Sequence, residues 1–342
     1  MKRARGVGLL SGGLDSALAC KVLMEAGADV VCLHFFTGFC VTGHHSRVGR
    51  EDKPISNDAL QVAAEIGVPI ELVDISKEYL SIVLHPKHGY GANMNPCIDC
   101  REFMLLKAKD HMEQVGADFV FTGEVIGQRP MSQTRSMLDA IERRTGLQGR
   151  LLRPLSAKLL PPTIVEREKL IDREKLLDLQ GRSRKHQLAL AERFGITRFM
   201  QPAGGCCFLT DEAYSRKFRD VILHKDEDAI SMDDVYLLGV GRHFRLSPAL
   251  KVIIGRDEVE NNFLSRYNQE YWCARARSYP GPTALVMGEI DEDSWEKIGA
   301  MVARYCDGKE QPSVEVEFSH GNDSRVLTVS PAPDELLGSF RI

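Results

Sequence analysis

The feature that most constrains the fold is a glycine-rich turn between an apolar run and a helical one. The turn reads Ser11-Gly-Gly-Leu-Asp-Ser16, and it follows a candidate strand at 7–10 and precedes a candidate helix at 17–26. Adjacent glycines let backbone N–H groups approach an anion without interference from a Cβ atom. The start of the following helix adds unpaired donors. The turn matches neither the Walker A pattern nor GxGxxG, and it predicts a phosphate-binding loop of another kind.

Strands and helices alternate through the first half of the sequence. Further candidate strands are 29–36, 69–74 and 118–122, and further candidate helices are 54–66, 76–84 and 97–115. Alternation at this spacing predicts βαβ units and an α/β fold with a doubly wound parallel sheet. Ligands of such sheets bind at the carboxyl ends of the strands, which is where the glycine-rich turn lies.

The chain has 342 residues, which predicts two or three domains. We expect a nucleotide-binding domain over 1–180, a basic helical and Gly/Cys-rich segment over 181–230 that completes the active site, and an accessory domain over 231–342. The middle part contains candidate helices at 166–179, 183–194 and 212–223. The last part alternates candidate strands at 250–254, 283–287, 314–318 and 325–329 with candidate helices at 257–267 and 291–305. We therefore predict a smaller C-terminal α+β domain.

Charge is distributed unevenly along the chain. Residues 143–193 hold 13 Lys/Arg against 6 Asp/Glu, whereas residues 231–342 hold 12 against 18. The basic middle part favours a polyanionic partner, and the alternative is a set of solvated helix faces. The sequence has neither a signal-peptide pattern nor an apolar stretch approaching the roughly 20 residues of a membrane span. We therefore expect a cytoplasmic protein with no membrane partner.

Nine cysteines in a cytosolic chain predict metal, cluster or catalytic use for those that cluster. Cys97 and Cys100 form a CxxC at a candidate helix start, which lowers thiol pKa values. Cys206 and Cys207 lie in a second Gly-rich loop. These thiolates are suited to a [4Fe–4S] cluster with one open iron, to Zn²⁺, or to persulfide chemistry without metal.

The other cysteines lie mostly in apolar patterns. Four of them are interpreted as buried core thiols: Cys20, Cys32, Cys273 and Cys306. Cys40 lies in a loop after the second candidate strand, and the sequence leaves its role undecided.

The glycine-rich turn resembles the SGGxDS signature of the PP-loop, or N-type ATP pyrophosphatase, superfamily. The resemblance implies an adenine nucleotide alpha hydrolase-like fold and cleavage between the α- and β-phosphates of ATP. Asp15 would help to hold Mg²⁺ on the departing pyrophosphate. The implied ATP-binding residues are Leu10, Ser11, Gly12, Gly13, Asp15, Ser16, His34, Phe36, Gly123 and Glu124.

Residues 95–109, with the Thr-Gly turn at 122–123, resemble tRNA thiolation enzymes of the 2-thiouridylase and 4-thiouridine synthetase type. The resemblance implies that a uridine carbonyl oxygen attacks the α-phosphorus and that sulfur then displaces AMP. It implies tRNA and a sulfur donor, either sulfide or a cysteine desulfurase relay, as partners. The implied catalytic residues are Asp15, Cys97, Cys100 and Cys207, and the hypothetical cluster ligands are Cys97, Cys100, Cys206 and Cys207.

Residues 239–245 and 251–258 resemble the small RNA-binding domain NFACT-R. Candidate RNA contacts, from this part and from the basic middle part, are Arg129, Arg143, Arg144, Arg150, Lys158, Arg182, Arg184, Lys185, Arg242, His243, Arg245, Lys251 and Arg256. Two alternatives stay open. One is a PP-loop ligase or amidotransferase that acts on a small molecule and binds structural zinc. The other is a sulfur-insertion enzyme that builds a cofactor.

Overall fold

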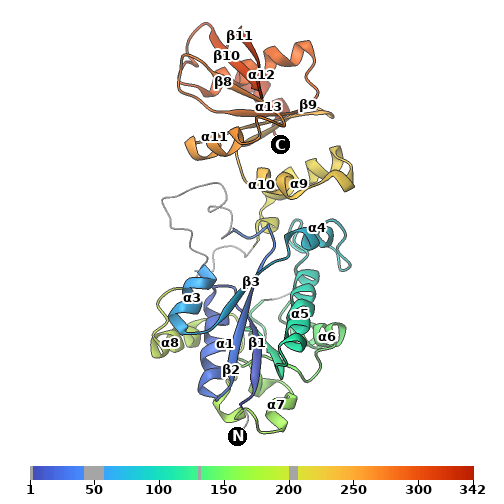
Figure 1. The fold of residues 1–342 in the computed structure, drawn as a ribbon, viewed down its shortest axis with the longest axis vertical. Coiled ribbons are helices and arrows are strands. Elements are labelled where there is room, and N and C mark those ends of the chain that lie inside the picture. The colour runs from blue at the N-terminus through green and yellow to red at the C-terminus, as the bar shows by residue number, and fades with distance from the viewer. Residues whose placement is uncertain (1–2, 42–57, 130–131, 200–206) are drawn as a thin grey trace. The chain divides into compact units, whose positions relative to one another are not determined.

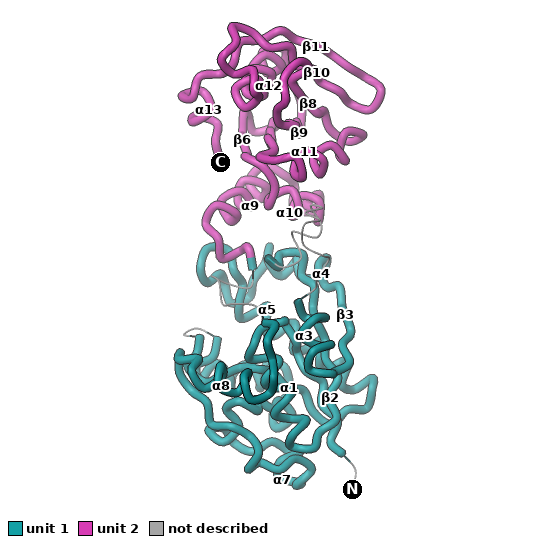
Figure 2. Tube along the Cα trace, turned by 90° about the vertical axis from the view of Figure 1, so that its left-hand side faces the viewer, with its two compact units in different colours: residues 1–42, 54–207 teal, residues 43–53, 208–342 magenta. Residues whose placement is uncertain are grey.

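The computed structural model describes residues 3–41, 58–129, 132–199 and 207–342. The chain forms two compact units, distinguished by colour in Figure 2. Unit 1 runs to Cys207, and unit 2 begins at Phe208. Each unit has a sheet and a hydrophobic core of its own. In the described part of the chain, no helix is both long enough and apolar enough to span a bilayer.

Unit 1 is built on a five-stranded sheet in which every adjacent pair is parallel. Its strands are β1 (Arg5–Leu9), β2 (Asp29–Phe36), β3 (Ile70–Asp74), β4 (Phe119–Phe121) and β5 (Leu151–Leu152), in the spatial order β3-β2-β1-β4-β5. Figure 1 labels β1, β2 and β3 of this sheet. The strand order reverses between β1 and β4, and a parallel α/β sheet forms its ligand crevice at such a reversal. The predicted doubly wound sheet is confirmed.

Helices cover both faces of this sheet. They are α1 (Leu14–Glu25), α3 (Asp58–Ile66), α4 (Ser76–Leu84), α5 (Cys97–Gln114), α6 (Arg135–Thr145), α7 (Ile164–Arg167) and α8 (Lys185–Phe194). One core packs residues such as Leu18 and Val62 against Phe119 and Phe121. The other core packs Leu105 against Val7 and Leu33 and continues into α6. Burial on both sides explains why these strands are continuously apolar rather than alternating.

Two glycines of β1 make room for two aromatic rings of β4. A Cβ atom on Gly6 would lie 2.5 Å from Cζ of Phe119, and a Cβ atom on Gly8 would lie 2.2 Å from Cζ of Phe121. Both rings are fully buried. The interlocking of ring and glycine fixes the register between β1 and β4, and so it fixes where the loop after β1 begins.

The helix expected over 166–179 is wrong. The structure has the short helix α7 and, after a break, a 3-10 turn at Arg173–Lys175. Lys169 has φ of 56° and reverses the chain. Arg173 then reaches back, with its Nη2 donating to the carbonyl oxygens of Ala157 and Leu160 at 2.8 Å each. These contacts stabilise a compact basic loop in place of a continuous helix.

Unit 2 has a six-stranded antiparallel sheet with helices, which confirms the predicted α+β class. Its strands are β6 (Arg242–Ser247), β7 (Leu250–Ile254), β8 (Trp272–Ala276), β9 (Ala284–Gly288), β10 (Val314–His320) and β11 (Asp323–Val329), in the order β11-β10-β8-β9-β7-β6. Its helices are α9 (Glu212–His224), α10 (Met232–Leu238), α11 (Glu258–Ser265), α12 (Glu292–Tyr305) and α13 (Asp334–Phe340). Trp295 of α12 packs edge-on against Trp272 and Phe318, with ring centroids 5.0 Å apart in each pair. Helix α9, which the sequence pattern assigned to the middle segment, belongs to unit 2.

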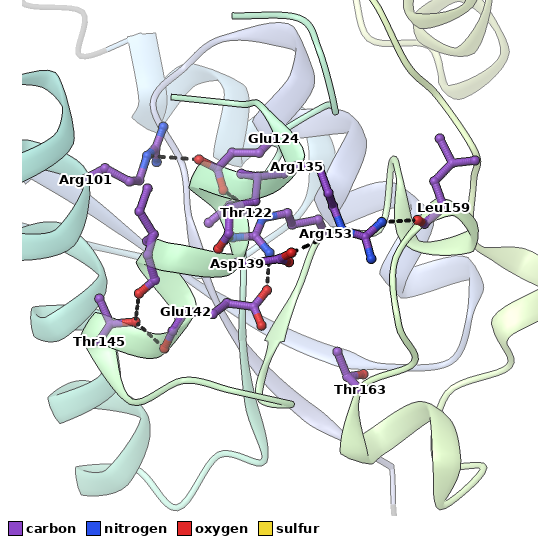
Figure 3. Close-up of polar contacts among 12 residues, drawn as sticks. Arg101, Thr122, Glu124, Arg135, Asp139, Glu142, Thr145, Arg153, Leu159 and Thr163 are labelled. Atoms are coloured by element: carbon purple, nitrogen blue, oxygen red, sulfur yellow. Dashed lines mark hydrogen bonds and ion pairs between the residues drawn. The ribbon is translucent and has the colours of Figure 1, made fainter. Parts of the chain in front are cut away.

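A buried arginine organises the edge of the first sheet (Figure 3). Arg153 follows β5 and is only 1% exposed. Its Nε lies 3.0 Å from Oε2 of Glu124, and its Nη1 pairs with Glu142. Arg101 and Thr122 bind the same Glu124 carboxylate, at 3.2 and 3.0 Å. The cluster joins α5, α6 and the ends of β4 and β5.

The pKa values of the two carboxylates that bind Arg153 shift in opposite directions. Burial alone would raise the pKa of Glu124, but the two guanidinium groups hold it below the ordinary value of 4.5. Burial raises the pKa of Glu142, which has one guanidinium and lies near Asp139 and Glu124. The direction for Glu124 is the more significant of the two, because its carboxylate is fully enclosed, accepts hydrogen bonds from Arg153 and Thr122 and is ion-paired with Arg101.

We predict that Arg153→Met lowers the free energy of unfolding of unit 1 by about 3–5 kcal/mol, because it leaves Glu124 buried without its main partner. Urea unfolding followed by circular dichroism at neutral pH measures this loss. The depressed pKa means that the Glu124 contribution is present above pH 4.5 and is lost as the pH falls through the lower folded-state pKa.

Arg135→Met provides the matched control, because Arg135 is 47% exposed in its ion pair with Asp139. It should cost less than about 1 kcal/mol. Equal losses for the two variants would contradict the assignment of Arg153 as the anchor.

Candidate functional site

The Ser11–Ser16 loop closes on itself through its two serines. Oγ of Ser16 donates to the carbonyl oxygen of Gly13 at 2.8 Å and accepts from the backbone N–H of Ser11 at 3.3 Å. Oγ of Ser11 accepts from the N–H of Gly13 at 3.4 Å. Helix α1 starts directly after Gly13, which has extended backbone and no side-chain cap. The first N–H groups of α1 are therefore available for an anion.

Two glycines allow backbone from other segments to approach this loop. Gly12 has φ of +80°, and a Cβ atom on it would lie 2.9 Å from the backbone N of Ala59. Gly123 follows β4, and a Cβ atom there would lie 2.4 Å from the backbone carbonyl of Asp15 and 2.5 Å from N of Ser16. The loop is thus enclosed by the start of α3 on one side and by the end of β4 on the other.

The negative charge of the Asp15 carboxylate is only partly stabilised by its neighbours. Nε2 of Gln128 donates to its Oδ2 at 2.9 Å, whereas its Oδ1 is buried and has no hydrogen-bond partner in the described part of the chain. Burial raises the pKa of Asp15 above the ordinary 3.8, and the Gln128 bond and the charges of Arg184 and Arg129 offset this only in part. A buried anionic oxygen without a partner fits a divalent cation, which prefers oxygen ligands.

Arg129 and Arg184 lie close enough to Asp15 to affect its pKa. The sequence made both of them candidate RNA contacts, but their position beside the loop suits the phosphates of a nucleotide. Nε of Arg184 is buried without a hydrogen-bond partner in the described residues. Gln128 was not singled out from the sequence. Its signal is weak, since only its place in the segment after β4 points to the site.

His34 and Phe36 lie at the carboxyl end of β2, beside the loop. Nδ1 of His34 donates to the carbonyl oxygen of Leu10 at 2.9 Å, which ties β2 to the entry of the loop. Burial lowers the pKa of His34 below its ordinary 6.5, so the ring is neutral at pH 7. Phe36 pairs with Asp74 of β3. Glu124, also expected at the nucleotide, has its carboxylate committed to Arg101, Arg153 and Thr122, so we infer a positioning role for it.

Cys97 and Cys100 begin α5, as the sequence predicts, and both are half-buried. Residues three apart on a helix share a face. Between them Asp99 is buried and accepts from the backbone N–H of Lys87 and His88, at 3.1 Å each, and from Nδ1 of His88 at 3.0 Å. The loop before α5 is thereby held against the start of the helix that carries the two thiols.

Cys207 lies next to a cysteine that the sequence left undecided. Its backbone forms an isolated antiparallel bridge with that of Cys40, and Sγ of Cys40 lies 3.1 Å from Oγ1 of Thr37. Antiparallel partners have Cα atoms about 4.5–5.5 Å apart, inside the range of about 4.4–6.8 Å that a disulfide spans. The signal that a sequence offers for Cys40 is its place just after the carboxyl end of β2.

The cysteines in apolar patterns are buried as predicted: Cys20, Cys32, Cys273 and Cys306. Cys206 lies outside the described residues. Among the residues that the structure describes, no three His, Cys, Asp or Glu side chains form a group that could hold a metal ion. The described thiols therefore do not by themselves provide the three ligands expected for a cluster.

The remaining basic candidates occupy different environments. Arg182 and Lys185 are exposed near the start of α8. Lys158 pairs with the carboxylate of Glu174 at 3.2 Å. In unit 2, Arg242 stacks on the ring of Tyr305, and Lys251 is buried against Asp220 at 3.0 Å. Lys251 is therefore no surface contact.

Comparison with known proteins finds a matching family model for part of each unit. Residues 5–166 match the family described as the tRNA methyl transferase HUP domain. Residues 241–341 match the family described as the NFACT protein RNA binding domain. These matches confirm the two resemblances inferred from the sequence, each over its own range.

Among curated proteins, the tRNA-specific 2-thiouridylase MnmA of Listeria monocytogenes serotype 4a (strain HCC23) is 30% identical over 144 residues, which cover 41% of this chain and 36% of that protein. The tRNA-specific 2-thiouridylase MnmA of Enterococcus faecalis (strain ATCC 700802 / V583) is 26% identical over 230 residues, 66% of this chain and 57% of that protein. The chain thus spans from about a third to just over half of these relatives. A crystal structure of a 4-thiouridine synthetase–RNA complex with bound ATP aligns with a TM-score of 0.34 at 25% identity, covering 56% of this chain and 52% of that chain.

We predict that Asp15→Asn increases the stability of the protein without nucleotide at neutral pH. The raised pKa means that ionising Asp15 opposes folding, so the two proteins should be equally stable below about pH 3.8 and diverge as the pH rises through the folded-state pKa. Thermal unfolding at several pH values measures the difference. MgATP should raise the Tm of the wild type more than that of the variant.

Asp110→Asn, an exposed position on α5, is the control and should change neither property. A lower Tm for Asp15→Asn at pH 7 would show that the charge is compensated within the protein and needs no cation.

Proposed function

We propose that the chain is an ATP-dependent sulfurtransferase that thiolates a uridine of tRNA and releases AMP and pyrophosphate. The observation that carries the proposal is the loop after β1, whose buried Asp15 oxygen lacks a partner in the described residues and whose helix start offers N–H donors. Support for the substrate comes from the similarity of 41–66% of the chain to proteins named tRNA-specific 2-thiouridylase. The match of unit 2 to an RNA-binding domain agrees with it.

In this proposal, ATP lies across the strand ends of unit 1 with its β- and γ-phosphates in the Ser11–Ser16 loop. Helix α1 supplies N–H donors, and Arg129 and Arg184 supply positive charge. Asp15, with Gln128 fixing one of its oxygens, would hold Mg²⁺ through the other. When bound, the ion neutralises charge on the departing pyrophosphate.

The uridine carbonyl oxygen attacks the α-phosphorus, and the bond to the β-phosphate oxygen breaks with its electron pair on pyrophosphate. The uridine must be turned out of its stack, at a cost of about a few kcal/mol. The adenylated carbon is then open to sulfur, because AMP is a far better leaving group than oxide.

In this proposal the sulfur step proceeds through cysteine alone, and the pairing of the Cys207 backbone with that of Cys40 supports it. Cys207 carries the sulfur as a persulfide, whose terminal sulfur attacks the adenylated carbon and displaces AMP. A second thiolate attacks Sγ of Cys207, and the bond to the transferred sulfur breaks with its electron pair on that sulfur, giving thiouridine. A dithiol reductant reduces the resulting disulfide, and a sulfur donor recharges Cys207.

Two thiols are candidates for the resolving role. Cys100, with Cys97 beside it at the start of α5, belongs to the catalytic set expected from the sequence. Cys40 is the one whose backbone pairs with that of Cys207. We assign the role to Cys40 because its Cα spacing to Cys207 suits a disulfide without movement of the backbone.

The reaction is tested with purified protein, ATP, Mg²⁺, a cysteine desulfurase with cysteine as the source of persulfide sulfur, and tRNA from cells that lack the gene. We expect AMP and pyrophosphate, together with thiouridine detected by nucleoside mass spectrometry. Asp15→Ala should abolish all three products, and Asp110→Ala should retain them. ADP and phosphate as products would refute the assignment. AMP release without thiouridine in any tRNA would favour a ligase or sulfur-insertion enzyme that acts on a small molecule.

The cysteine roles are separated by single substitutions to serine. Cys207→Ser should lose both the one-sulfur mass increase of the charged protein and thiouridine formation. Cys40→Ser should accumulate a covalent protein–tRNA adduct that a reductant breaks. Cys306→Ser, in the core of unit 2, is the control. An adduct in Cys100→Ser instead would move the resolving role to α5.

Purification without oxygen tests the cluster hypothesis for Cys97, Cys100 and Cys206 or Cys207. A brown protein with about four irons per chain, lost in Cys97→Ala and Cys100→Ala, would replace the persulfide route. A colourless active protein prepared with iron available supports the persulfide route. Cys206→Ser should then be less damaging than Cys207→Ser.

A further inference from the structure

Unit 2 contains a cavity of about 210 Å³ between helices α9 and α10 and the sheet. Strands β6, β7 and β9 contribute its floor, and the residue after α9 and the turn between β6 and β7 contribute its rim. The volume is smaller than the roughly 300–1,000 Å³ of sites for drug-sized ligands. It has room for one base or ribose ring with a phosphate group at its opening, and it excludes a double helix.

The charged groups at this cavity carry an excess of positive charge. The lining includes the cations Lys225, Arg245 and Lys251 and the carboxylate Asp234, and the carboxylate of Asp220 pairs with two of these cations from outside the lining. Asp234 is paired with Lys225 at 2.7 Å. Asp220 is shared by Arg245, at 2.7 Å, and Lys251, at 3.0 Å. One carboxylate therefore compensates two cations.

Lys217 lies outside the lining but close enough to Lys251 for the two charges to interact, and Glu260 and Asp211 also act on it. Its Nζ donates to the carbonyl oxygens of Leu238 and Gly241, at 3.1 and 3.5 Å. Burial, with Arg256 and Lys251 near by, lowers its pKa to about 8, so it is still mostly charged at pH 7. A buried site with surplus positive charge is stabilised by an anion.

His243 presents an acceptor that has no donor in the described residues. The ring is 1% exposed and lines the cavity. Its Nε2 donates to the carbonyl oxygen of Val240 at 2.8 Å, which leaves Nδ1 as the acceptor. Nδ1 is buried and without a hydrogen-bond partner in the part of the chain that the structure describes. Burial and the charges of Lys251 and Lys217 keep the pKa of His243 well below its ordinary value, against the opposing effect of the Val240 and Leu237 carbonyl oxygens, so the ring is neutral. Nδ1 is then an acceptor that no described donor reaches.

We propose that this cavity binds one nucleotide of single-stranded RNA, with its phosphate at Arg245 and Lys251 and a ribose or base donor at Nδ1 of His243. The apolar walls, Leu237, Ile253 and Met287, take the ring of the base. The inference rests on unit 2 being an RNA-binding domain, and it does not depend on the thiolation chemistry. The ligand that this cavity fits carries an anionic group, a hydrogen-bond donor and an apolar ring.

The test is fluorescence anisotropy with the full chain and a labelled single-stranded pentauridylate, with excess MgATP to occupy the loop of unit 1. Arg245→Gln should weaken binding by about tenfold or more and reduce the salt slope by about one. Met287→Trp, which fills the cavity without changing charge, should weaken binding and leave the slope unchanged. Arg277→Gln is the matched control, since Arg277 is 50% exposed and lies outside the cavity.

Competition identifies the ligand chemistry. Uridine monophosphate should displace the labelled strand, and inorganic phosphate at the same concentration should not. Equal affinity of all variants, or equal competition by inorganic phosphate, overturns the proposal. Thermal unfolding of each variant shows whether unit 2 is folded, and Met287→Trp decides the outcome if Arg245→Gln unfolds. AMP and pyrophosphate formation is measured separately, so failure of this site leaves the proposed reaction untouched.

Discussion

The contact on which the site in unit 1 depends is the approach of β4 to the first turn of α1. At Gly123 the chain lies so close to the backbone of Asp15 and Ser16 that no Cβ atom fits. The contact places Gln128, a few residues further along, where it can hold one oxygen of Asp15. It also brings Arg129 to the same carboxylate. The geometry of the phosphate loop is therefore determined as much by the strand across from it as by its own six residues.

Buried charge is compensated to different degrees at different places in the chain. Around Glu124, three side chains bind one buried carboxylate, and the cluster stabilises the edge of the sheet. Oδ1 of Asp15 and Nδ1 of His243 lack a hydrogen-bond partner in the described residues; Oε1 of Glu124 lacks one too, but its carboxylate is ion-paired with Arg101 and Arg153. Incomplete compensation disfavours the empty site and favours the bound one. This difference distinguishes groups that stabilise the fold from candidate ligand-binding groups.

Much of the architecture was predictable from the sequence because its signals are local. Continuous apolar runs predicted β2 over 29–36 without error, and the turn between β1 and α1 located the site. Features that depend on distant partners were not predictable. The reversal at Lys169 is stabilised by contacts of Arg173 with a distant segment. Cys40 becomes a candidate functional residue only because its backbone pairs with that of Cys207. Likewise, no pattern distinguishes the buried Lys251 from a solvated lysine, because the difference is made by Asp220 from another element.

The fit of Phe119 and Phe121 into the space above Gly6 and Gly8 also limits how such a protein can diverge over evolutionary time. A methyl group added at either glycine collides with a ring, and a ring removed first leaves a void in a packed core. Neither single step is neutral, so each pair should change together or not at all. The inner strand would then be among the slowest parts of the chain to drift, although none of its side chains is expected to touch a substrate.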